Sequence, residues 1–547
     1  MLKRLFILSL IILTPWFSTF GSRPKLVVVI SLDQFRYDYL TRFQDYFGSG
    51  GFRMLMDNGA NFSNASYKHS ANMTGPGHAV ILTGTYGNQN GIITNNWYDR
   101  TKQQNVYCVA DPGAQLVGAS GEGRSPANLI TPTFGDELRL HTGFKSKVIS
   151  IAHKDRAAIL MGGKMPNDVF WLIDSTFVTS SYYMNALPLW VQSFNESGQA
   201  NSYFGKRWER LLPDEAFAAI DDDNVPYESD WSSIGRTFPH PIRGSDSTRI
   251  TKSYYSAFMT SPFSMEALAT LAKAAIEGEH LGQGEFPDLL CIGFSSTDYV
   301  GHTFGPHSRE VIEMAVQTDK ILADFLLYLD EHVGLRNTIV VLTSDHGVAP
   351  IPEYIRSRFL GADVNRLSGK KLLDFCNSSL ANVFGSTIEG KPWIKRMVDG
   401  NVYLDRDLLR EKKLDPENVA AVLADSLMSV HELALAVTHQ ALRTSTLATP
   451  LHAKMQRSFH PMRSGDVMFV LKPFMYLDDS AEGAEHGSPY EHDAHVPLII
   501  MGNGVRSGTY ATEAGPADIG PTLSTLLGVE FPAAREGRVL VEALTPP

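Results

Sequence analysis

The chain has 547 residues, of which 43% are hydrophobic and 20% charged, enough to bury a large core or to build more than one domain. Its 48 basic and 59 acidic residues give a formal net charge of −11, which argues against long-range attraction to nucleic acid or to an anionic membrane. An anionic substrate would therefore have to be attracted by local positive charge.

The first residues have the pattern of an export signal. Lys3 and Arg4 precede a short apolar stretch, and small residues follow it near position 21. A retained membrane anchor is the alternative, but the stretch is short for a membrane span. We therefore expect residues 1–22 to be a signal peptide, which predicts a periplasmic or secreted protein without a stable membrane anchor.

Strand and helix signals then alternate along the chain. The pattern predicts strands at 25–32, 146–152, 289–296, 338–344 and 496–501, and helices at 75–83, 265–277, 309–332 and 518–527. This alternation is typical of an α/β fold, in which helices flank a mostly parallel central sheet.

Two long stretches interrupt this alternation, at about 162–243 and about 353–480. The second contains predicted helices at 416–427 and 430–442 and a predicted strand at 467–472. Long irregular segments inside a compact domain usually have a functional role. We therefore expect one catalytic domain, 23–547, with two insertions that cap the carboxyl ends of the strands.

The three cysteines allow at most one internal disulfide, and they do not decide the redox compartment. Cys291 lies inside a strand-like apolar run. We expect it to be a buried thiol.

Acidic residues and histidines follow several of the apolar runs. Asp33 follows the first strand directly, and Asp345 with His346 follows the strand at 338–344. Asp298 and His302 are four residues apart, so one helical turn would place both on one face, where they could share a metal. Helix capping is the alternative for each aspartate taken alone. Because the strand ends of a parallel sheet lie along one edge, the motifs together predict a site for two metals.

A threonine is the candidate nucleophile. In the segment N-M-T-G-P-G-H, Gly75 and Gly77 allow close approach of the backbone, and Pro76 suits the start of a helix. Thr74 would then project from the helix start, where amide groups favour an anion. A simple helix cap is the alternative, but a nearby metal would activate the hydroxyl as a nucleophile.

Two cations follow another strand. Lys154 and Arg156 are two residues apart in H-K-D-R, and the guanidinium of an arginine suits phosphate oxygens. A solvated charged turn is the alternative. Asn95 could donate a hydrogen bond to the same anion, although most asparagines in such a run are turn residues.

Taken together, these motifs resemble the alkaline phosphatase superfamily, and most closely the phosphate-irrepressible, broad-specificity bacterial alkaline phosphatases with a threonine nucleophile. The motifs that carry the resemblance are T-G-P-G-H, N-N-W-Y-D from Asn95, H-K-D-R from His153, S-T-D-Y-V-G-H, T-S-D-H-G and E-H-G-S from Glu485. They occur in the family's order through most of the chain and are weakest in the two insertions.

The resemblance implies an alkaline phosphatase-like fold and a phosphomonoesterase with two zinc ions. One zinc would be held by Asp298, His302 and His486, and the other by Asp33, Asp345 and His346. Thr74 would form a phosphothreonine, while Asn95, Lys154 and Arg156 would bind the nonbridging phosphoryl oxygens. The expected partners are small phosphate monoesters and no nucleic acid, and the protein is expected to be a monomer.

A nucleotide pyrophosphatase or phosphodiesterase is the alternative, because those relatives share the metal ligands and the threonine. They are not expected to have the pair formed by Lys154 and Arg156, which would favour the extra charge of a monoester. A sulfatase would need a cysteine or serine in place of Thr74.

His486 has two competitors nearby, His492 and His495. We predict His486 as the ligand because H-G-S is its family-like context, and because His495 directly precedes a strand. His78, His153 and His307 are predicted to be structural or to lie outside the ligand set.

Overall fold

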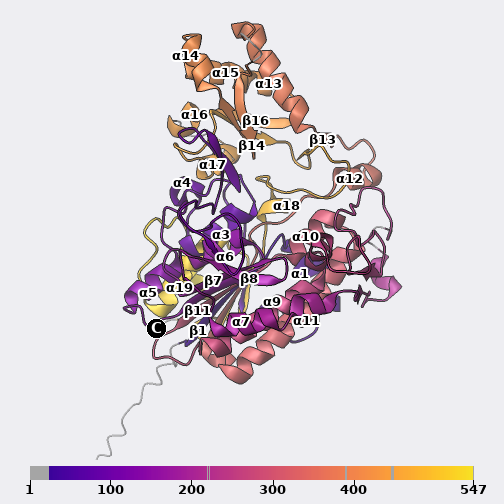
Figure 1. The fold of residues 1–547 in the computed structure, drawn as a ribbon, viewed down its shortest axis with the longest axis vertical. Helices are drawn as coiled ribbons and strands as arrows, with labels where there is room; N and C mark the ends of the chain where they lie inside the picture. Colours follow the sequence, from indigo (N-terminus) through magenta and orange to yellow (C-terminus); the bar gives the residue numbers. More distant parts are fainter. Residues whose placement is uncertain (1–23, 219, 221, 388–390, 445–448, 546–547) are drawn as a thin grey trace, which may run out of the picture.

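The structure is a computed structural model that describes residues 24–218, 220, 222–387, 391–444 and 449–545 (Figure 1). The predicted signal peptide, 1–22, lies outside the described residues. No helix among the residues described has the length and apolar character needed to cross a membrane.

A ten-stranded sheet forms the centre of the molecule, in the order β20-β2-β19-β12-β1-β11-β6-β7-β8-β5. Its strands are β1 (Leu26–Leu32), β2 (Ala60–Phe62), β5 (Leu116–Val117), β6 (Val148–Ala152), β7 (Asp168–Ile173), β8 (Thr176–Ser180), β11 (Asp288–Phe294), β12 (Thr338–Thr343), β19 (Leu498–Met501) and β20 (Gly508–Tyr510). The strands from β12 to β7 are parallel, whereas β19, β8 and β5 pair in antiparallel fashion. The predicted α/β fold with a mostly parallel central sheet is confirmed.

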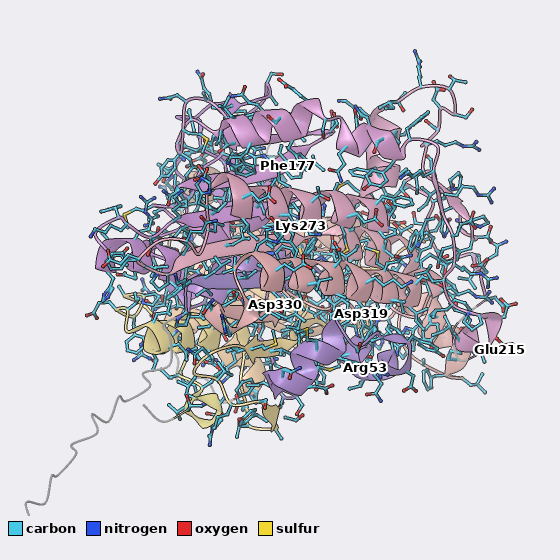
Figure 2. All side chains as sticks on the ribbon, turned by 90° about the horizontal axis from the view of Figure 1, so that it is seen from below. Arg53, Phe177, Glu215, Lys273, Asp319 and Asp330 are labelled. Atoms are coloured by element: carbon cyan, nitrogen blue, oxygen red, sulfur yellow. The ribbon has the colours of Figure 1, made fainter. Side chains whose placement is uncertain are left out.

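Both faces of this sheet are covered. Alternate side chains of β1 belong to two apolar clusters, with Val28 and Ile30 on one face and Val27 and Val29 on the other. The first face packs against α9 (Pro262–Gly278) and α11 (Arg309–His332), and the second against α3 (Thr74–Thr83), α5 (Phe134–His141) and α19 (Ile519–Leu527). Figure 2 shows α9 and α11 side by side, with Lys273 and Asp330 on their outer surface. A strand buried on both faces explains the continuous apolar run in its sequence.

The predicted core elements are confirmed, with boundaries that differ by a few residues. One prediction in the second insertion is wrong, because the segment 430–442 does not form a helix. It contains β16 (Leu433–Thr438) followed by α16 (His439–Thr444). Its alanines and leucines have high helix propensity, but pairing with β17 (Val467–Leu471) overrides that preference.

The described residues between 366 and 477 form a subdomain that we call the cap. It contains a four-stranded antiparallel sheet in the order β14-β15-β17-β16, where β14 is Ile394–Val398 and β15 is Asn401–Leu404. Helices α13 (Gly369–Phe384) and α15 (Pro416–Leu427) share an apolar cluster with this sheet. The cap stands at one end of the molecule (Figure 1). It is joined there by the parallel pair β13 (Arg366–Leu367) and β18 (Tyr476–Leu477).

The other interrupted segment, at about 162–243, contributes β7 and β8 to the central sheet before it leaves the core. Farther along, the indole of Trp231 donates a hydrogen bond to Thr303 at 2.8 Å and lies beside the Tyr299 ring. Both partners belong to α10 (Ser296–Phe304), so this part of the segment supports that helix.

The three cysteines are buried free thiols in separate apolar clusters. Cys108 lies near α3, Cys291 lies within β11, and Cys376 lies in the cap. The prediction of a buried thiol at Cys291 is confirmed.

Candidate bimetal active site

The ends of β1 and β12 bring together the first set of candidate metal ligands. The potential ligand atoms of Asp33, Asp345 and His346 all lie within 4.8 Å of one another. His346 Nε2 is 3.4 Å from Asp33 Oδ1 and 3.5 Å from Asp345 Oδ2. These three atoms are buried and have no hydrogen-bond partner. Orphaned acceptors around one point fit a bound cation. We call these residues the buried set.

The second set lies on α10 and the loop that bears His486. Asp298 and His302, one helical turn apart, form a group with His486 whose potential ligand atoms also lie within 4.8 Å. His302 Nε2 is 3.3 Å, and His486 Nε2 3.9 Å, from Asp298 Oδ1. The His302 side chain is 27% exposed, whereas those of the buried set are 0–1% exposed. We call this second group the open set.

Each histidine of the two sets is oriented in the same way. The Nδ1 atoms of His302, His346 and His486 lie 2.6–2.9 Å from backbone carbonyl oxygens, those of Ala484, Gly347 and Asn72 respectively. An Nδ1–H bonded to a carbonyl leaves Nε2 as the lone-pair nitrogen, which is the arrangement of metal-binding imidazoles. His492 and His495 bond instead to Ser488 and to the Ser63 carbonyl, so the structure brings only His486 of the three into a ligand group.

The two sets adjoin each other. The rings of His346 and His486 stack with centroids 3.7 Å apart. The backbone amide of Gln34 donates to Asp345 Oδ1, and its side-chain amide donates to Asp298 Oδ1 at 2.8 Å. Gln34 has a positive φ of 63°, a conformation that is costly for this residue type and is held by both bonds. Gln34, two residues beyond the end of β1, therefore fixes one set against the other.

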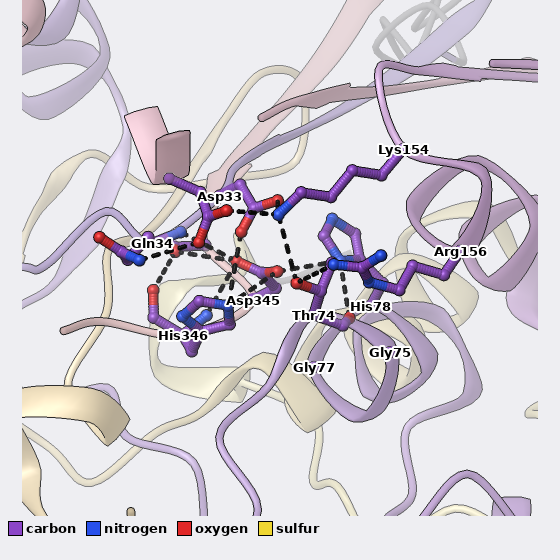
Figure 3. Close-up of polar contacts among 12 residues, drawn as sticks. Asp33, Gln34, Thr74, Gly75, Gly77, His78, Lys154, Arg156, Asp345 and His346 are labelled. Atoms are coloured by element: carbon purple, nitrogen blue, oxygen red, sulfur yellow. Dashed lines mark hydrogen bonds and ion pairs between the residues drawn. The ribbon is translucent and has the colours of Figure 1, made fainter. Parts of the chain in front are cut away.

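Lys154 also spans the two sets. Its Nζ atom lies 2.7 Å from Asp33 Oδ2 and 2.6 Å from Asp298 Oδ2 (Figure 3). Burial opposes the charge on Lys154, but the two carboxylates outweigh it and raise the pKa of the ammonium group. The two carboxylates therefore favour the charged form of Lys154 at the centre of the site.

Burial and neighbouring charges shift the pKa values of two carboxylates in opposite directions. Burial, together with Asp298 and Asp345, raises the pKa of Asp33 well above its usual range. Burial would also raise the pKa of Asp298, but Lys154 and His302 hold it well below its usual range. Several carboxylates gathered in a dry site repel each other, and this excess of negative charge favours cations.

Thr74 begins α3 beside both cations. Its Oγ1 accepts hydrogen bonds from Arg156 at 3.3 Å and from Lys154 at 3.5 Å (Figure 3). The helix can approach because Gly77 has no side chain, since a Cβ there would lie 2.1 Å from the Asp345 carbonyl oxygen. His78, one turn along, lies 3.1 Å from Asp345 Oδ2. The hydroxyl thus lies at a helix start beside two positive charges and the buried set.

Arg156 is held by a chain of polar contacts. One guanidinium nitrogen donates to the Tyr107 hydroxyl at 3.3 Å, and that hydroxyl donates to Asp155 Oδ1 at 2.5 Å. Arg124 donates to the other oxygen of Asp155. This chain orients the guanidinium while its second terminal nitrogen donates to Thr74.

Asn95 lies beside the helix start. Its Oδ1 accepts from the Gly75 amide at 2.7 Å, which leaves the side-chain NH₂ group to donate elsewhere. Asn95, Thr74, Lys154, Arg156 and the open set all line one cavity of about 240 Å³. All the residues selected from the sequence as nucleophile, oxyanion donors or ligands therefore meet in one place.

Two of the histidines predicted to lie outside the ligand set have structural contacts. His153 accepts from the Ser295 amide and bonds the Ser264 carbonyl, and His307 stacks on Tyr354 with ring centroids 4.1 Å apart. Neither belongs to a ligand group among the described residues.

A family model described as type I phosphodiesterase / nucleotide pyrophosphatase matches residues 27–495. The chain belongs to this family.

Its relatives within this family are similar over almost their whole length. Alkaline phosphatase PhoV of Synechococcus elongatus is 35% identical over 528 residues, covering 96% of this chain and 93% of that protein. Alkaline phosphatase PafA of Elizabethkingia meningoseptica is 33% identical over 531 residues, covering 95% of each chain. A crystal structure of PafA superposes with a TM-score of 0.88 over 96% of this chain and 99% of that one. The predicted superfamily and the prediction of a hydrolytic enzyme are confirmed.

Sequence reasoning missed one residue that reaches this site from the cap. Asp399 lies at the turn between β14 and β15, lines the catalytic cavity and accepts from the Asn96 amide at 3.2 Å. Burial raises the pKa of Asp399 to about 6 despite that bond and the nearby charge of Arg156. The available signal was the Asp-Gly pair between two apolar runs, which is typical of a two-residue hairpin turn.

Proposed function

We propose that this protein is a secreted, metal-dependent alkaline phosphatase that hydrolyses phosphate monoesters through a phosphothreonine on Thr74. The observation that carries the proposal is the position of the Thr74 hydroxyl, 3.3 Å from Arg156 and 3.5 Å from Lys154, beside the two candidate ligand sets. A nucleophile, two fixed cations and two metal sites at one point suit phosphoryl transfer.

The residues present fit two zinc ions, because both sets combine carboxylates with imidazoles whose Nε2 atoms face the carboxylate oxygens. Zinc at these sets would act as a Lewis acid that lowers the pKa of the threonine hydroxyl and neutralises charge on the phosphoryl group. Asp33, Asp345 and His346 would hold one ion, and Asp298, His302 and His486 the other.

The chain's own residues would act in two displacements. The Thr74 hydroxyl gives up its proton to solvent as its oxygen bonds to phosphorus, while the bond from phosphorus to the alcohol oxygen breaks; the alcohol leaves with that electron pair and gains a proton from solvent. Water then bonds to phosphorus and loses a proton to solvent while the bond from phosphorus to Thr74 Oγ1 breaks, and Oγ1 takes up a proton, which restores the threonine and releases phosphate. Arg156, Lys154 and Asn95 donate to the nonbridging oxygens, where charge is concentrated in the transition state.

The same cations favour a monoester over a diester. A monoester carries one more charged oxygen, and the buried Lys154 and half-buried Arg156 reward that charge because they are partly shielded from water. A nucleotide pyrophosphatase or phosphodiesterase remains the second candidate, since the matched family model bears that description.

The test is the ratio of kcat/KM for phenyl phosphate to that for methyl phenyl phosphate, measured with zinc-loaded enzyme. We expect a monoester preference of at least about a hundredfold, since a lost contact to a charged group costs several kcal/mol. The variant combining Lys154→Ala and Arg156→Ala should reduce this preference to about tenfold or less.

The control variant combines Lys370→Ala with Lys371→Ala, which removes two exposed cations from the cap and should leave the ratio unchanged. A diester preference that survives the site variant would assign the protein to phosphodiesterases.

Export and assembly are part of the same proposal. The N-terminal pattern supports a periplasmic or extracellular location, so mass spectrometry of the exported protein should find a mature N-terminus near residue 22. A protein that keeps residues 1–22 and stays with the cells would contradict export. Light scattering after size-exclusion chromatography should find a monomer of the mature chain, and a dimer would contradict that expectation.

A further inference from the structure

A second cavity, of about 250 Å³, opens beside the catalytic one. Met73, Asp399, Glu485 and His486 line both cavities, so the two adjoin at this boundary. The second cavity extends between the cap sheet and the loop around His486. It adjoins the open set through His486 and has no lining residue from the buried set among the described residues.

One wall of this cavity is apolar. The cap contributes Met468, Phe469, Val470, Leu471, Met475 and Leu477, and Met73 and Ala71 face it from the segment before the nucleophile. Methionine side chains adapt their shape and contact aromatic rings favourably through sulfur. An apolar cavity of 150 Å³ is large enough to bind benzene, so this one has room for a substituted ring.

The charged groups of the cavity have one sign. Asp399 and Glu485 lie where it meets the catalytic cavity and Asp493 lies farther along, whereas neither lysine nor arginine is among the described lining residues. The phosphate site next to it contains Lys154 and Arg156. An ester that spans both cavities would therefore keep its anionic end with the cations and its alcohol beside carboxylates.

The carboxylate of Asp399 is held in place by the backbone. Asp399 and Gly400 have φ of 46° and 74°, the signature of a two-residue hairpin turn in which both central residues have positive φ. One carboxylate oxygen accepts from the Asn96 amide, next to the oxyanion donor Asn95. The cap thus places a negative charge at a fixed point at the boundary of the two cavities.

From this arrangement we infer that the second cavity is a subsite for the alcohol part of the substrate, which accepts an uncharged aromatic ring and, through Asp399, rejects an anionic one. The inference rests on the proposed phosphomonoesterase function and adds a substrate class to it: phosphate esters of uncharged aromatic alcohols.

The test compares methyl phosphate, benzyl phosphate and 4-carboxybenzyl phosphate, whose alcohols leave with similar ease. Burying a ring should raise kcat/KM for benzyl over methyl phosphate by about tenfold or more. The added carboxylate should lower it again by about fivefold. Asp399→Asn keeps the shape and the acceptor of the turn, and it should reduce the discrimination against the carboxylate at least threefold.

Two further variants test whether the aromatic ring of the substrate binds against the apolar wall. Met475→Gln, of similar size, should lower the benzyl preference severalfold, because it makes the apolar wall polar. Asp425→Asn, an exposed position on α15 of the cap, is the matched control and should change neither ratio.

A binding measurement tests the subsite separately from the proposed phosphomonoesterase activity. Calorimetry with benzylphosphonate and methylphosphonate should give about a tenfold tighter dissociation constant for the former, whether or not the enzyme turns over. Equal affinities, or discrimination against the carboxylate that Asp399→Asn leaves unchanged, would overturn the subsite. Absence of turnover with the affinity difference intact would overturn only the phosphomonoesterase.

Discussion

The two candidate metal sets differ in their surroundings more than in their chemistry. The buried set comes from residues just beyond the ends of β1 and β12, has side chains 0–1% exposed, and lies under the start of α3. The open set comes from α10 and a loop, exposes 27% of His302, and borders two cavities. The difference indicates that the strand ends hold one set in a dry interior, while the other set lines cavities that are open to solvent.

The prediction with the largest expected effect compares the loss of one ligand residue from each set. Asp345→Ala removes the carboxylate beside His78 and the acceptor of the Gln34 amide in a dry site, together with one candidate metal ligand. We therefore expect kcat/KM to fall by on the order of 10⁴ and the unfolding free energy by about 3 kcal/mol. His302→Ala should lower kcat/KM about a hundredfold, with partial recovery at high zinc concentration, and should change stability little. Kinetics, elemental analysis of zinc and chemical unfolding measure these effects.

His141→Ala, which removes an exposed histidine from α5, is the control and should change none of these quantities. If His302→Ala lowers stability and zinc content as much as Asp345→Ala does, the two sets are equivalent and the comparison fails.

Metal removal gives a second test, of intermediate size. A dilute chelator should release zinc in two phases, with the open set emptying about ten times faster because His302 is accessible to solvent. Activity should disappear with the first phase. The released zinc can be followed with a chromogenic indicator, and release in a single phase would contradict the prediction.

The smallest expected effect concerns Asp399, the cap residue that lines the same cavity as the open set. The pKa of Asp399 is raised from 3.8 to about 6 by burial, so the unfolded chain loses its proton before the folded one as the pH rises through this window. Folding is therefore penalised increasingly between about pH 4 and pH 6, and constantly above that. Asp399→Asn lacks this ionisation, so it should be more stable than the wild type by about 1–2 kcal/mol at pH 8 and equally stable at pH 4.

Urea unfolding of both proteins at the two pH values measures this difference. Asp425→Asn, in which an exposed carboxylate of the cap is removed, should give no pH-dependent gain. A constant difference across the pH range would show that Asp399 does not ionise in a buried environment.

The central sheet and most of the site could be predicted from the sequence because most of the candidate catalytic and metal-binding residues lie just beyond long apolar runs. Asp33 comes directly after a buried strand, Asp345 and His346 come two and three residues after another, and Asp298 and His302 have the spacing of one helical turn. His486 follows no strand, and it was chosen over its neighbours through its family-like context. Where a strand is an unbroken apolar run in the sequence, the prediction from that run agrees with the place of the strand in the sheet.

The cap could not be predicted to the same degree because its elements depend on tertiary contacts. Residues 433–436 alternate leucine and alanine, which supports helix and strand alike, and only pairing with β17 decides between them. Asp399 has no chemical signature in the sequence, and its role depends on how a hairpin turn meets the loop around Asn96. A residue whose role depends on contact with a segment distant in the sequence cannot be identified from the sequence around it.

The three buried thiols have a practical consequence for producing the protein. Cys108, Cys291 and Cys376 lie in different apolar clusters, and burial raises the pKa of the Cys108 thiol to about 12. A thiol that is neither ionised nor accessible does not exchange with other thiols or disulfides. Folding therefore needs no oxidase or disulfide isomerase, and recombinant expression without the first 22 residues in a reducing cytoplasm should give the same fold as export.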